Sequence, residues 1–591
     1  MAIIRQKNRT NGIEYVFLSV SRRVPDKKWP VSERTSLGHF DLDGDFVPSS
    51  YFLSLDERQQ LATGLVVEPF VRRTGGTAAL VRKRCGFDLL FSHAARQTQV
   101  DKILRAVFPS TWKALLSLVY FNLAEPDLPM YRFKRFDRNN LHPYGQDVHK
   151  DMITGLLRMV DEQARSTTFE MLRKANSTQG ARLLALDSTS IAALGELLYR
   201  ASRGYSKEGL RDEEQLELLT VYDLDNRIPV YYRTLEGKIA DVSTLENTAR
   251  DLSRDGMDPR LVVFVMDRGY YSDANVRQLL KARYKFVYAV DIRCNSFAAE
   301  AVRSAGPSVQ CTDNYIQDKD LYCARIAHVI DIPRRGRGEN RKDLALDICF
   351  NPERAQREQQ LLSRKLSRMR AALESAKALL EPKSEYSRFF SAVEKKVYGK
   401  GTVVEYVVNA DQEQLERSLC GFFAYLSDGS LDKEEVVDAY AQRMMVECSF
   451  KNFKERYSRP MHSDDQGVDG EIYVTFLTVV LESWIRERMK EKRLGGKFTM
   501  RSLFDEIEGI ECSFPSDKPR NRIYSEITNK AGMILYQMGV AMPDGCWPAK
   551  VRETIAREQR EIGKVQKAAE KEAAKSAKQE ADSCSAKKKE I

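Results

Sequence analysis

Apolar and polar residues alternate in two different ways along the first third of the chain. Up to about residue 94, short alternating runs such as EYVFLSVSRRV, with candidate turns at Gly38 and Gly44, predict strands joined by turns. From 95 to 178, apolar residues recur every three or four positions, as in STWKALLSLVYFNLAE, which predicts helices. We therefore expect a small β-rich module followed by a small helical one.

The next segment contains strand signals in a fixed order. ARLLALDST, at 181–189, is a short apolar run that ends in Asp187. QLELLTVYDL and RIPVYYRTL flank the turn DNR at 225–227 and predict a hairpin. A predicted helix follows, and then LVVFVMDRGYYSDANV predicts a buried strand that stops at Asp267, with Ser272 placed to cap another helix.

Three strands, a helix and a fourth strand, with one carboxylate on the first strand and another just past the fourth, predict an RNase H-like core. More than 100 residues separate KFVYAV at 285–290 from GFFAYLSD at 421–428, so we expect an insertion domain there. Within it, Asn351 and Pro352 predict a helix start. Its apolar repeat fits an arm packed on its own domain as well as a dimer contact: Leu362, Leu366, Met369, Leu373, Ala376 and Leu380.

A later predicted helix, in YAQRMMVECSFKNFKERYSRPMH at 440–462, has an unusual polar stripe. Four different polar side chains share one narrow sector of it at 100° per residue: Tyr440, Arg443, Glu447 and Lys454. Val446, Phe450 and Phe453 form an apolar stripe beside them. The apolar stripe would anchor the helix while its polar edge faces another partner.

Composition and charge narrow the class of protein. The chain has 591 residues, 42% hydrophobic and 30% charged, which is typical of a globular protein of several domains. Its net charge is +10, and basic residues cluster in RKR at 82–84, RFKRFDR at 132–138 and PRRGRGENRK at 333–342. Such clusters suit nucleic acid, because each phosphate neutralised by Lys or Arg releases a condensed counterion.

Cysteines and apolar runs bear on the compartment. The ten cysteines form no C-x-x-C pair and no zinc spacing, and MAIIRQKNRTNG lacks the apolar region of a signal peptide. We therefore expect a reducing, cytoplasmic location. The longest apolar run, YVTFLTVVL at 473–481, is far shorter than the ~20 residues that span a bilayer, so it predicts a buried helix.

Three carboxylates are the candidates for catalysis: Asp187, Asp267 and Glu447. Clustered carboxylates repel one another in a cleft, and oxygen ligands without His or Cys favour Mg²⁺ or Mn²⁺. Two such ions ~3.5 to 4 Å apart can activate an attacking hydroxyl and stabilise the leaving oxygen of a phosphodiester. Taken singly, each acid more often has a local role. Four further aspartates are assigned to local hydrogen bonds of turns and first helical turns: Asp223, Asp225, Asp241 and Asp273.

In these features the chain resembles the insertion-sequence DDE transposases, whose third acid lies in a Y-(2)-R-(3)-E-(6)-K signature. All four positions match, at Tyr440, Arg443, Glu447 and Lys454. Other blocks over about 181–485 look like the same family: LLALDSTSI, GYSKEGLRDEEQL, DLDNRIPVYYRTLEGKIADVSTL, VMDRGYYSDANV, GFFAYLSD and YSRPMH.

The resemblance implies a cut-and-paste transposase whose catalytic and metal-binding triad is formed by the three acids, with two Mg²⁺ or Mn²⁺ ions per site. It implies that Tyr440, Arg443 and Lys454 contact phosphates at the transposon end. Hydrolysis would free a 3′-OH at each end of a mobile element, and that hydroxyl would attack target DNA. Because both ends are cut together, we expect a homodimer on paired ends. We expect no membrane partner.

Other predictions about function stay open at this point. The end sequence is expected to be read by the helices of 95–178 and by basic N-terminal loops. Arg203, Tyr205 and Lys207 lie on a predicted loop that fits DNA contact and an ordinary surface equally well. Two alternatives remain: a metal-dependent nuclease that never joins strands, and a non-catalytic DNA-binding protein derived from a transposase. The acidic SDDQGVDGEIYV after RPMH and the Ala/Lys-rich tail depart from the family pattern.

The expected architecture is a multidomain α/β protein in which an insertion domain interrupts an RNase H-like mixed-sheet catalytic core. N-terminal β and helical DNA-binding modules precede the core, and a C-terminal helical region follows it. The expected segments are a β-rich module at 1–94, a helical DNA-binding module at 95–178, the core at 179–290 and 419–495, the insertion domain at 291–418, a helical region at 496–550, and a charged helical or disordered tail at 551–591.

Overall fold

The chain divides into two compact units. The terminal unit consists of Met1–Asn176, Leu194–Leu198 and Phe453–Ile591, and the central unit of Ser177–Ala193 and Tyr199–Asn452. The computed structural model describes residues 2–7, 13–23, 31–40, 46–55, 63, 65, 80–176, 182–192, 202–203, 214–236, 241–254, 258–293, 297–332, 340–375, 380–381, 384–397, 401–443, 464–516, 522–542 and 545–561.

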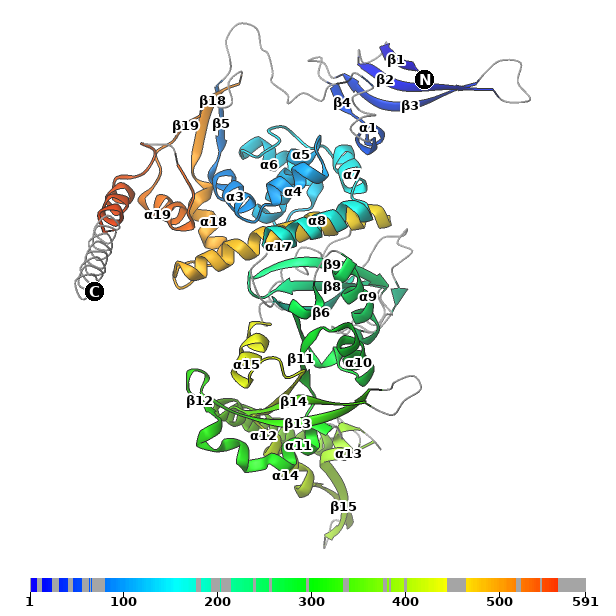
Figure 1. Cartoon of the computed structure of the whole chain (residues 1–591), viewed down its shortest axis with the longest axis vertical. Coiled ribbons are helices and arrows are strands. Elements are labelled where there is room, and N and C mark those ends of the chain that lie inside the picture. The colour runs from blue at the N-terminus through cyan, green and yellow to red at the C-terminus, as the bar shows by residue number, and fades with distance from the viewer. Residues whose placement is uncertain are drawn as a thin grey trace, which may run out of the picture. The chain divides into compact units, whose positions relative to one another are not determined.

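The central unit is built on one mixed sheet, which has ten strands among the described residues (Figure 1). The strand order is β12-β13-β14-β17-β11-β10-β6-β8-β7, and β9 also pairs with β8. The strands are β6 (Arg182–Ala192), β7 (Ser202–Arg203), β8 (Glu214–Asp223), β9 (Ile228–Glu236), β10 (Val262–Met266), β11 (Lys285–Val290), β12 (Tyr315–Ile316), β13 (Leu321–Ile332), β14 (Asn340–Phe350) and β17 (Phe422–Ser427).

The strands at the middle of this sheet follow the sequence prediction. β8 and β9 form the expected antiparallel hairpin, and β10 runs parallel to both β6 and β11. All five residues of β10 are buried, as expected for a strand covered on both faces. The helices of the unit are α9 (Asp241–Arg254), α10 (Asp273–Ala282), α11 (Phe297–Ala305), α12 (Pro352–Glu374), α13 (Glu385–Phe389), α14 (Ala410–Leu419) and α15 (Lys433–Gln442).

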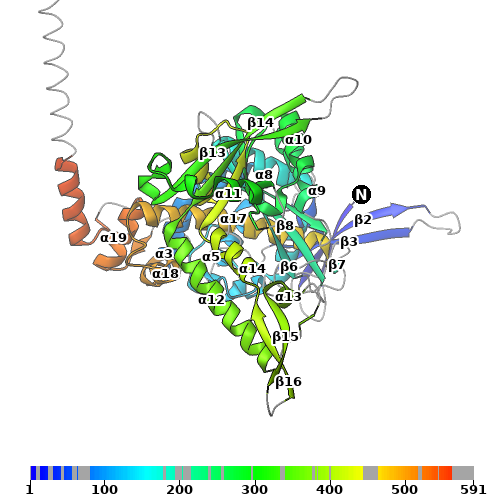
Figure 2. The same cartoon turned by 90° about the horizontal axis from the view of Figure 1, so that it is seen from below.

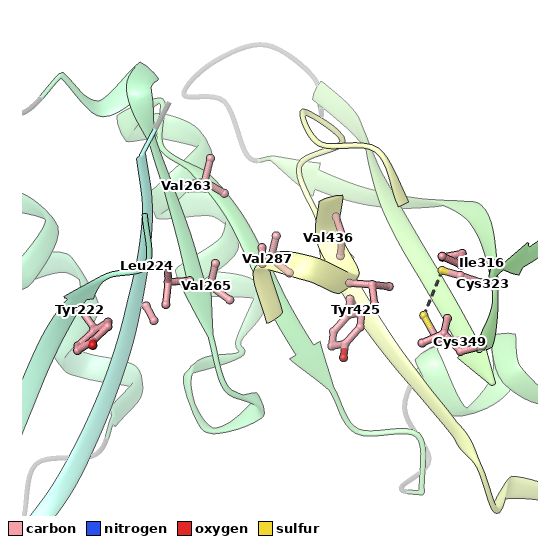
Figure 3. Close-up of a cluster of buried hydrophobic side chains, with 14 residues drawn as sticks. Tyr222, Leu224, Val263, Val265, Val287, Ile316, Cys323, Cys349, Tyr425 and Val436 are labelled. Carbon is pink, nitrogen blue, oxygen red and sulfur yellow. Dashed lines mark hydrogen bonds between the residues drawn. The ribbon is translucent and has the colours of Figure 1, made fainter. Parts of the chain in front are cut away.

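Helices cover the two faces of the middle strands. On one face, Phe264 of β10 contacts Tyr284, whose hydroxyl donates to the carbonyl of Ala249 in α9. On the other face, α15 packs its apolar residues onto alternate strand positions such as Val263 and Val265. Figure 3 shows this second core, which also includes Val287, Tyr425, Cys323 and Cys349 (Figure 3). The packing fixes where α15 lies on the sheet.

The predicted insertion domain is not a separate body. β13 and β14 pair with each other along their whole length, and β14 pairs with β17, so both extend the central sheet. Sequence reasoning was wrong here because pairing between β14 and β17 joins residues about 80 positions apart and leaves no local pattern. What stands apart from the sheet is an arm, made of α12 and the hairpin β15 (Phe390–Val397) and β16 (Gly401–Val408).

The arm helix begins as predicted. The side chain of Asn351 accepts a hydrogen bond from the backbone N–H of Arg354, and Pro352 occupies the first turn. Leu366, Met369 and Leu373 pack against Phe389, Phe390 and the hairpin. Of the two readings of the apolar repeat, these contacts are those of an arm packed on its own unit, and Figure 2 shows α12 alongside β15 and β16 (Figure 2).

The terminal unit combines a small β module with a helical bundle. Its strands are β1 (Ala2–Lys7), β2 (Glu14–Arg22), β3 (Val31–Phe40), β4 (Phe46–Pro48), β5 (Leu80–Arg84), β18 (Glu511–Pro515) and β19 (Ile523–Tyr524). Its helices are α1 (Ser50–Ser54), α3 (Gly86–Gln97), α4 (Val100–Val107), α5 (Trp112–Ala124), η1 (Met130–Arg132), α6 (Phe133–Asn139), α7 (Lys150–Arg158), α8 (Glu162–Ala175), α17 (Asp465–Glu491), α18 (Met500–Glu508) and α19 (Asn529–Met538).

Three predictions for this unit need correction. Gly38 is not in a turn but inside β3, paired with Pro48 of β4, and Gly44 lies outside the described residues. The segment 496–550, predicted as helical, also contains β18 and β19, and β18 pairs with β5. The long helix α17, predicted as part of the core, packs in the terminal unit, where Asn122 of α5 donates to Thr475 at 3.2 Å.

The run at 473–481 is a buried helical segment, as predicted. Among the described helices, none combines the length and the apolarity that crossing a membrane requires.

Candidate active site

Strand register alone brings the first two acids together. Leu186 of β6 lies opposite Met266 of β10 in a parallel pair, so the next residues, Asp187 and Asp267, occupy neighbouring positions. Adjacent strands lie about 4.8 Å apart. The two carboxylates, 80 residues apart in the chain, therefore meet at the carboxyl end of β10.

Side-chain alternation decides which face the acids occupy. Asp187 shares its face of β6 with Ala185, and Asp267 continues the face of Val263 and Val265. Those apolar residues belong to the core that α15 covers. The end of α15 therefore lies on the same side of the sheet as both acids.

Two residues at the end of α15 contact the acids. Nη2 of Arg443 donates to Oδ2 of Asp187 at 2.8 Å and lies 3.7 Å from Oδ2 of Asp267. The Tyr440 hydroxyl donates to Oδ1 of Asp267 at 3.2 Å. Both acids also accept from the backbone N–H of the next residue, Ser188 and Arg268 respectively. The two carboxylates thus converge on one cationic group.

The acids differ in exposure. The Asp187 side chain is 12% exposed and that of Arg443 is 6% exposed, whereas the Asp267 side chain is 41% exposed. Asp187 therefore depends more on its partner, because an unpaired carboxylate is costly where water is excluded. Asp267 forms the solvent-facing side of the site.

Tyr440 lies between the acids and the hydrophobic core. Its ring packs 4.6 Å from that of Tyr425 in β17, and the Arg443 guanidinium lies 5.7 Å from the Tyr440 ring centre. Burial raises the pKa of the Tyr440 hydroxyl well above its usual range, and the neighbouring Asp267 carboxylate raises it further. The phenol therefore stays protonated and acts as a hydrogen-bond donor.

The start of α15 is held by an ion pair on the extended part of the sheet, between a fully buried aspartate and a partly exposed arginine. Arg325 of β13 binds Asp347 of β14 through two hydrogen bonds of 2.6 and 2.8 Å, and Asp347 is fully buried. The third guanidinium contact, from Nη1, goes to the carbonyl of Leu431 at 2.8 Å. Asp432 then caps α15 in a capping box with Glu435. Strands that were predicted to form a separate domain thus position the helix that carries Tyr440 and Arg443.

Several predicted site residues lie outside the described residues: Glu447, Lys454, Tyr205 and Lys207. Arg203 is in the short strand β7, opposite Glu214, rather than in a loop, and its side chain is not among those described. Within the described part of the chain, no group of three His, Cys, Asp or Glu residues is arranged to hold a metal. The described site therefore contains two of the three predicted acids.

The aspartates assigned to local roles are placed as follows. Asp223 accepts two hydrogen bonds from Asn226 in the hairpin turn, as expected. The prediction for Asp225 was wrong, because it accepts from the backbone N–H of Leu183 in β6, 42 residues away, rather than from its own turn. Asp273 accepts from the Tyr271 hydroxyl, a local contact as expected. Asp241 begins α9, and its side chain is not among those described.

Sequence reasoning missed two features of this site. It did not foresee that Tyr440 and Arg443 contact the aspartates; their assignment to DNA phosphates stays a prediction. Their shared helix stripe with an acid was the available signal, because it showed that these groups face a common partner. Arg325 and Asp347 carried no signal, since neither lies in a recognisable motif and their contact depends on strand register.

Comparisons with known proteins agree with this picture at the level of the family. Residues 178–481, about half of the chain, match the family described as transposase DDE domain. None of the curated proteins compared matches the chain. A solved structure it resembles is the cryo-EM structure of the piggyBac transposase synaptic complex with hairpin DNA. The likeness has 12% identity, covers 80% of this chain and 84% of that chain, and has a TM-score of 0.32, too low to define the fold.

Proposed function

The chain belongs to the DDE transposase family and is a DNA transposase, and from this premise we propose that Asp187 and Asp267 are two of its catalytic acids. The observation that carries the proposal is their adjacency on parallel strands, with both carboxylates directed at the guanidinium of Arg443. Glu447, four residues beyond Arg443 in the signature, is proposed as the third acid.

We further propose that the fold around the acids is an RNase H-like core. Support comes from the order of the middle strands, β9-β8-β6-β10-β11, which is 3-2-1-4-5 in chain order. β8 is antiparallel to both of its neighbours, β6 and β9. β10 is parallel to both of its neighbours, β6 and β11. In this arrangement β6 and β10 are parallel neighbours, and the proposed site is formed by the middle of β6 and the carboxyl end of β10.

The donor set fits a divalent cation. Asp187 and Asp267 offer carboxylate oxygens that already converge on a positive group, and oxygen-only sites favour Mg²⁺ or Mn²⁺. When bound, one or two such ions would supply Lewis-acid activation of the attacking oxygen and charge neutralisation at phosphorus. The proposed ligands are Asp187, Asp267 and Glu447.

The remaining residues would bind the DNA rather than the metal. Once a cation neutralises the acids, Arg443 is free to present its planar fork to a phosphate of the transposon end. Tyr440 would donate a hydrogen bond and Lys454 would add a point charge. Backbone contacts of this kind hold the scissile phosphate in place without reading sequence.

We propose that the chain acts as a homodimer on paired transposon ends and joins the freed 3′-OH groups to target DNA. Joining is separable from cutting when the substrate is supplied already cut. Incubating the chain with pre-cut ends, target plasmid and Mg²⁺ is expected to give joined products. Release of nicks without any joined product would contradict the proposal and leave only a nuclease.

The test of the acids is Asp187→Asn, which keeps the shape of the side chain and removes its charge. The variant is expected to bind end DNA but to lose cleavage with Mg²⁺ by at least about 10²-fold. The matched control is Asp225→Asn, on the β8–β9 turn of the same unit, which should cleave like the wild type. Cleavage by folded Asp187→Asn at the wild-type rate would refute the assignment.

A further inference from the structure

The two halves of the arm helix α12 differ in how their basic residues are balanced by acidic ones. In its first two turns, Arg354 pairs with Glu358 at 2.9 Å, and Arg357 pairs with Glu353 at 3.7 Å. The following fifteen residues, 359–373, contain four basic residues and no acid: Arg364, Lys365, Arg368 and Arg370. Glu374, the last residue of α12, is the only acid of the helix after Glu358, so the second half of the helix carries an excess of positive charge.

Helix geometry sorts these residues by face. At 100° per residue, Arg357, Arg364 and Arg368 lie within about 40° of one another. The residues that pack on the β15–β16 hairpin lie on the opposite side of the helix: Leu366, Met369 and Leu373. Arg364 and Arg368 are both exposed, so this arginine face is directed away from the arm's own core.

The arginine face is kept at a cost to the helix. Arg364 and Arg368 are four residues apart, and like charges at this spacing destabilise a helix by about 0.2 to 0.5 kcal/mol. No described carboxylate lies within ion-pair distance of either residue, whereas Lys365 on the flank pairs with Glu385. A surface that leaves this repulsion unneutralised is complementary to a polyanion.

We infer that the arginine face of α12, through Arg364 and Arg368, binds the phosphate backbone of duplex DNA. The inference rests on the proposed function for the choice of DNA as the polyanion. Guanidinium groups pair well with phosphate oxygens, and each contact releases counterions. Contacts of this type add affinity on any sequence, so the arm supplies a DNA-binding surface distinct from the acidic site.

The test compares two arginines on this face with one on another face of the same helix. Arg370 lies about 140° from the arginine face and lines a cavity of about 320 Å³ beside α14, so Arg370→Glu makes the same charge change in a different direction. Binding of the full chain to a short duplex of arbitrary sequence is measured between about 50 and 200 mM salt.

Arg364→Glu and Arg368→Glu are each expected to weaken binding about tenfold and to lower the salt slope by about one contact, equally on two unrelated sequences. The affinity of Arg370→Glu for the duplex should stay within about twofold of that of the wild type. If the arginine face binds the DNA, affinity depends on which face of α12 carries the charge and not on the total charge of the chain. Equal loss in all three variants, or no loss in any, would overturn the inference. All three side chains are exposed, and unchanged melting temperatures would verify the fold.

Failure of this inference is distinguishable from failure of the proposed function. Asp187→Asn should bind the same duplex as the wild type while losing cleavage. If Asp187→Asn cleaves, the catalytic assignment fails and the α12 result stands. If Asp187→Asn is inactive but Arg364→Glu and Arg368→Glu bind normally, the α12 inference alone fails.

Discussion

Arg443 offsets the repulsion between Asp187 and Asp267, because its guanidinium lies within ion-pair distance of both carboxylates. A divalent cation offsets the same repulsion and needs the same oxygen atoms. A metal held as proposed would therefore compete with the guanidinium for Oδ2 of Asp187. The residue proposed to hold DNA contacts the same two carboxylates that are proposed as metal ligands.

Competition of this kind predicts that Arg443→Gln binds Mn²⁺ more tightly than the wild type in the absence of DNA. An increase of about tenfold corresponds to 1.4 kcal/mol and is measurable by calorimetry. Without metal, the variant should lose about 3 kcal/mol of unfolding free energy, because Asp187 is left buried and unpaired. Mn²⁺ should restore part of that loss.

The control for this prediction is Arg233→Gln, which breaks the ion pair with Asp251 elsewhere in the central unit. Its Mn²⁺ affinity should equal that of the wild type. Identical Mn²⁺ affinity in Arg443→Gln and wild type would show that the guanidinium does not compete with metal.

The acids and their neighbours differ in how far sequence could predict them. Asp187 and Asp267 were identified because each follows an apolar run, which is a local feature. The runs were read as stopping at the acids, which holds for β10, whereas β6 continues past Asp187 to Ala192. Tyr440 and Arg443 were identified from their helix stripe, but the partner they contact depends on where α15 packs. Asp347 could not be identified, because the role of a fully buried aspartate in a strand can be inferred only once its partner, Arg325, is known.

Among the elements, β13 and β14 have the largest effect on the site. They widen the sheet beyond β17 and, through Arg325, hold the carbonyl that precedes α15. Local patterns predicted the β8–β9 hairpin and β10 correctly. They could not predict that β14 joins β17, because pairing across the arm is decided by packing rather than by periodicity.

The contact of Arg325 with Asp347 and with the carbonyl before α15 predicts that Asp347→Asn destabilises the central unit by about 2 kcal/mol. Both carboxylate oxygens of the fully buried Asp347 accept from Arg325, and Asn would place an amide N–H group where one of them lies. The control is Asp331→Asn on the same two strands, where the pair with Arg341 is exposed and weak, at 3.5 Å. That variant should change stability by less than about 0.5 kcal/mol.

Hydrogen exchange of the α15 amides provides the measurement for this contact. Amides of α15 should exchange faster in Asp347→Asn, because Arg325 is no longer held against the carbonyl at the start of the helix. They should be unchanged in Asp331→Asn. Equal exchange of α15 in both variants would mean that the ion pair does not position the helix.

At the scale of the whole chain, the terminal unit is assembled from both ends of the sequence. β5 pairs with β18, and Arg82 pairs with Glu511 across a separation of 429 residues. Phe504 of α18 packs 5.3 Å from Phe91 of α3. Sequence reasoning placed these segments in separate modules, because contacts between residues so far apart leave no trace in local periodicity.

The contact between the two terminal segments brings the first turn of α3 against the backbone of α18. A Cβ atom added at Gly86 would lie 1.8 Å from the carbonyl oxygen of Ile507, so the two helices can approach only because residue 86 is glycine. Gly86→Ala should therefore cost about 3 kcal/mol and lower the melting temperature of the terminal unit.

The matched control for Gly86→Ala is Gly509→Ala, at the end of α18 itself. Gly509 has helical backbone angles, and an added Cβ there would meet no atom within 4 Å. That change should leave the free energy of unfolding within about 0.5 kcal/mol of the wild type. Thermal unfolding combined with hydrogen exchange in α3 and α18 separates the two variants. If both variants have the melting temperature of the wild type, α3 and α18 do not make the contact that the structure shows.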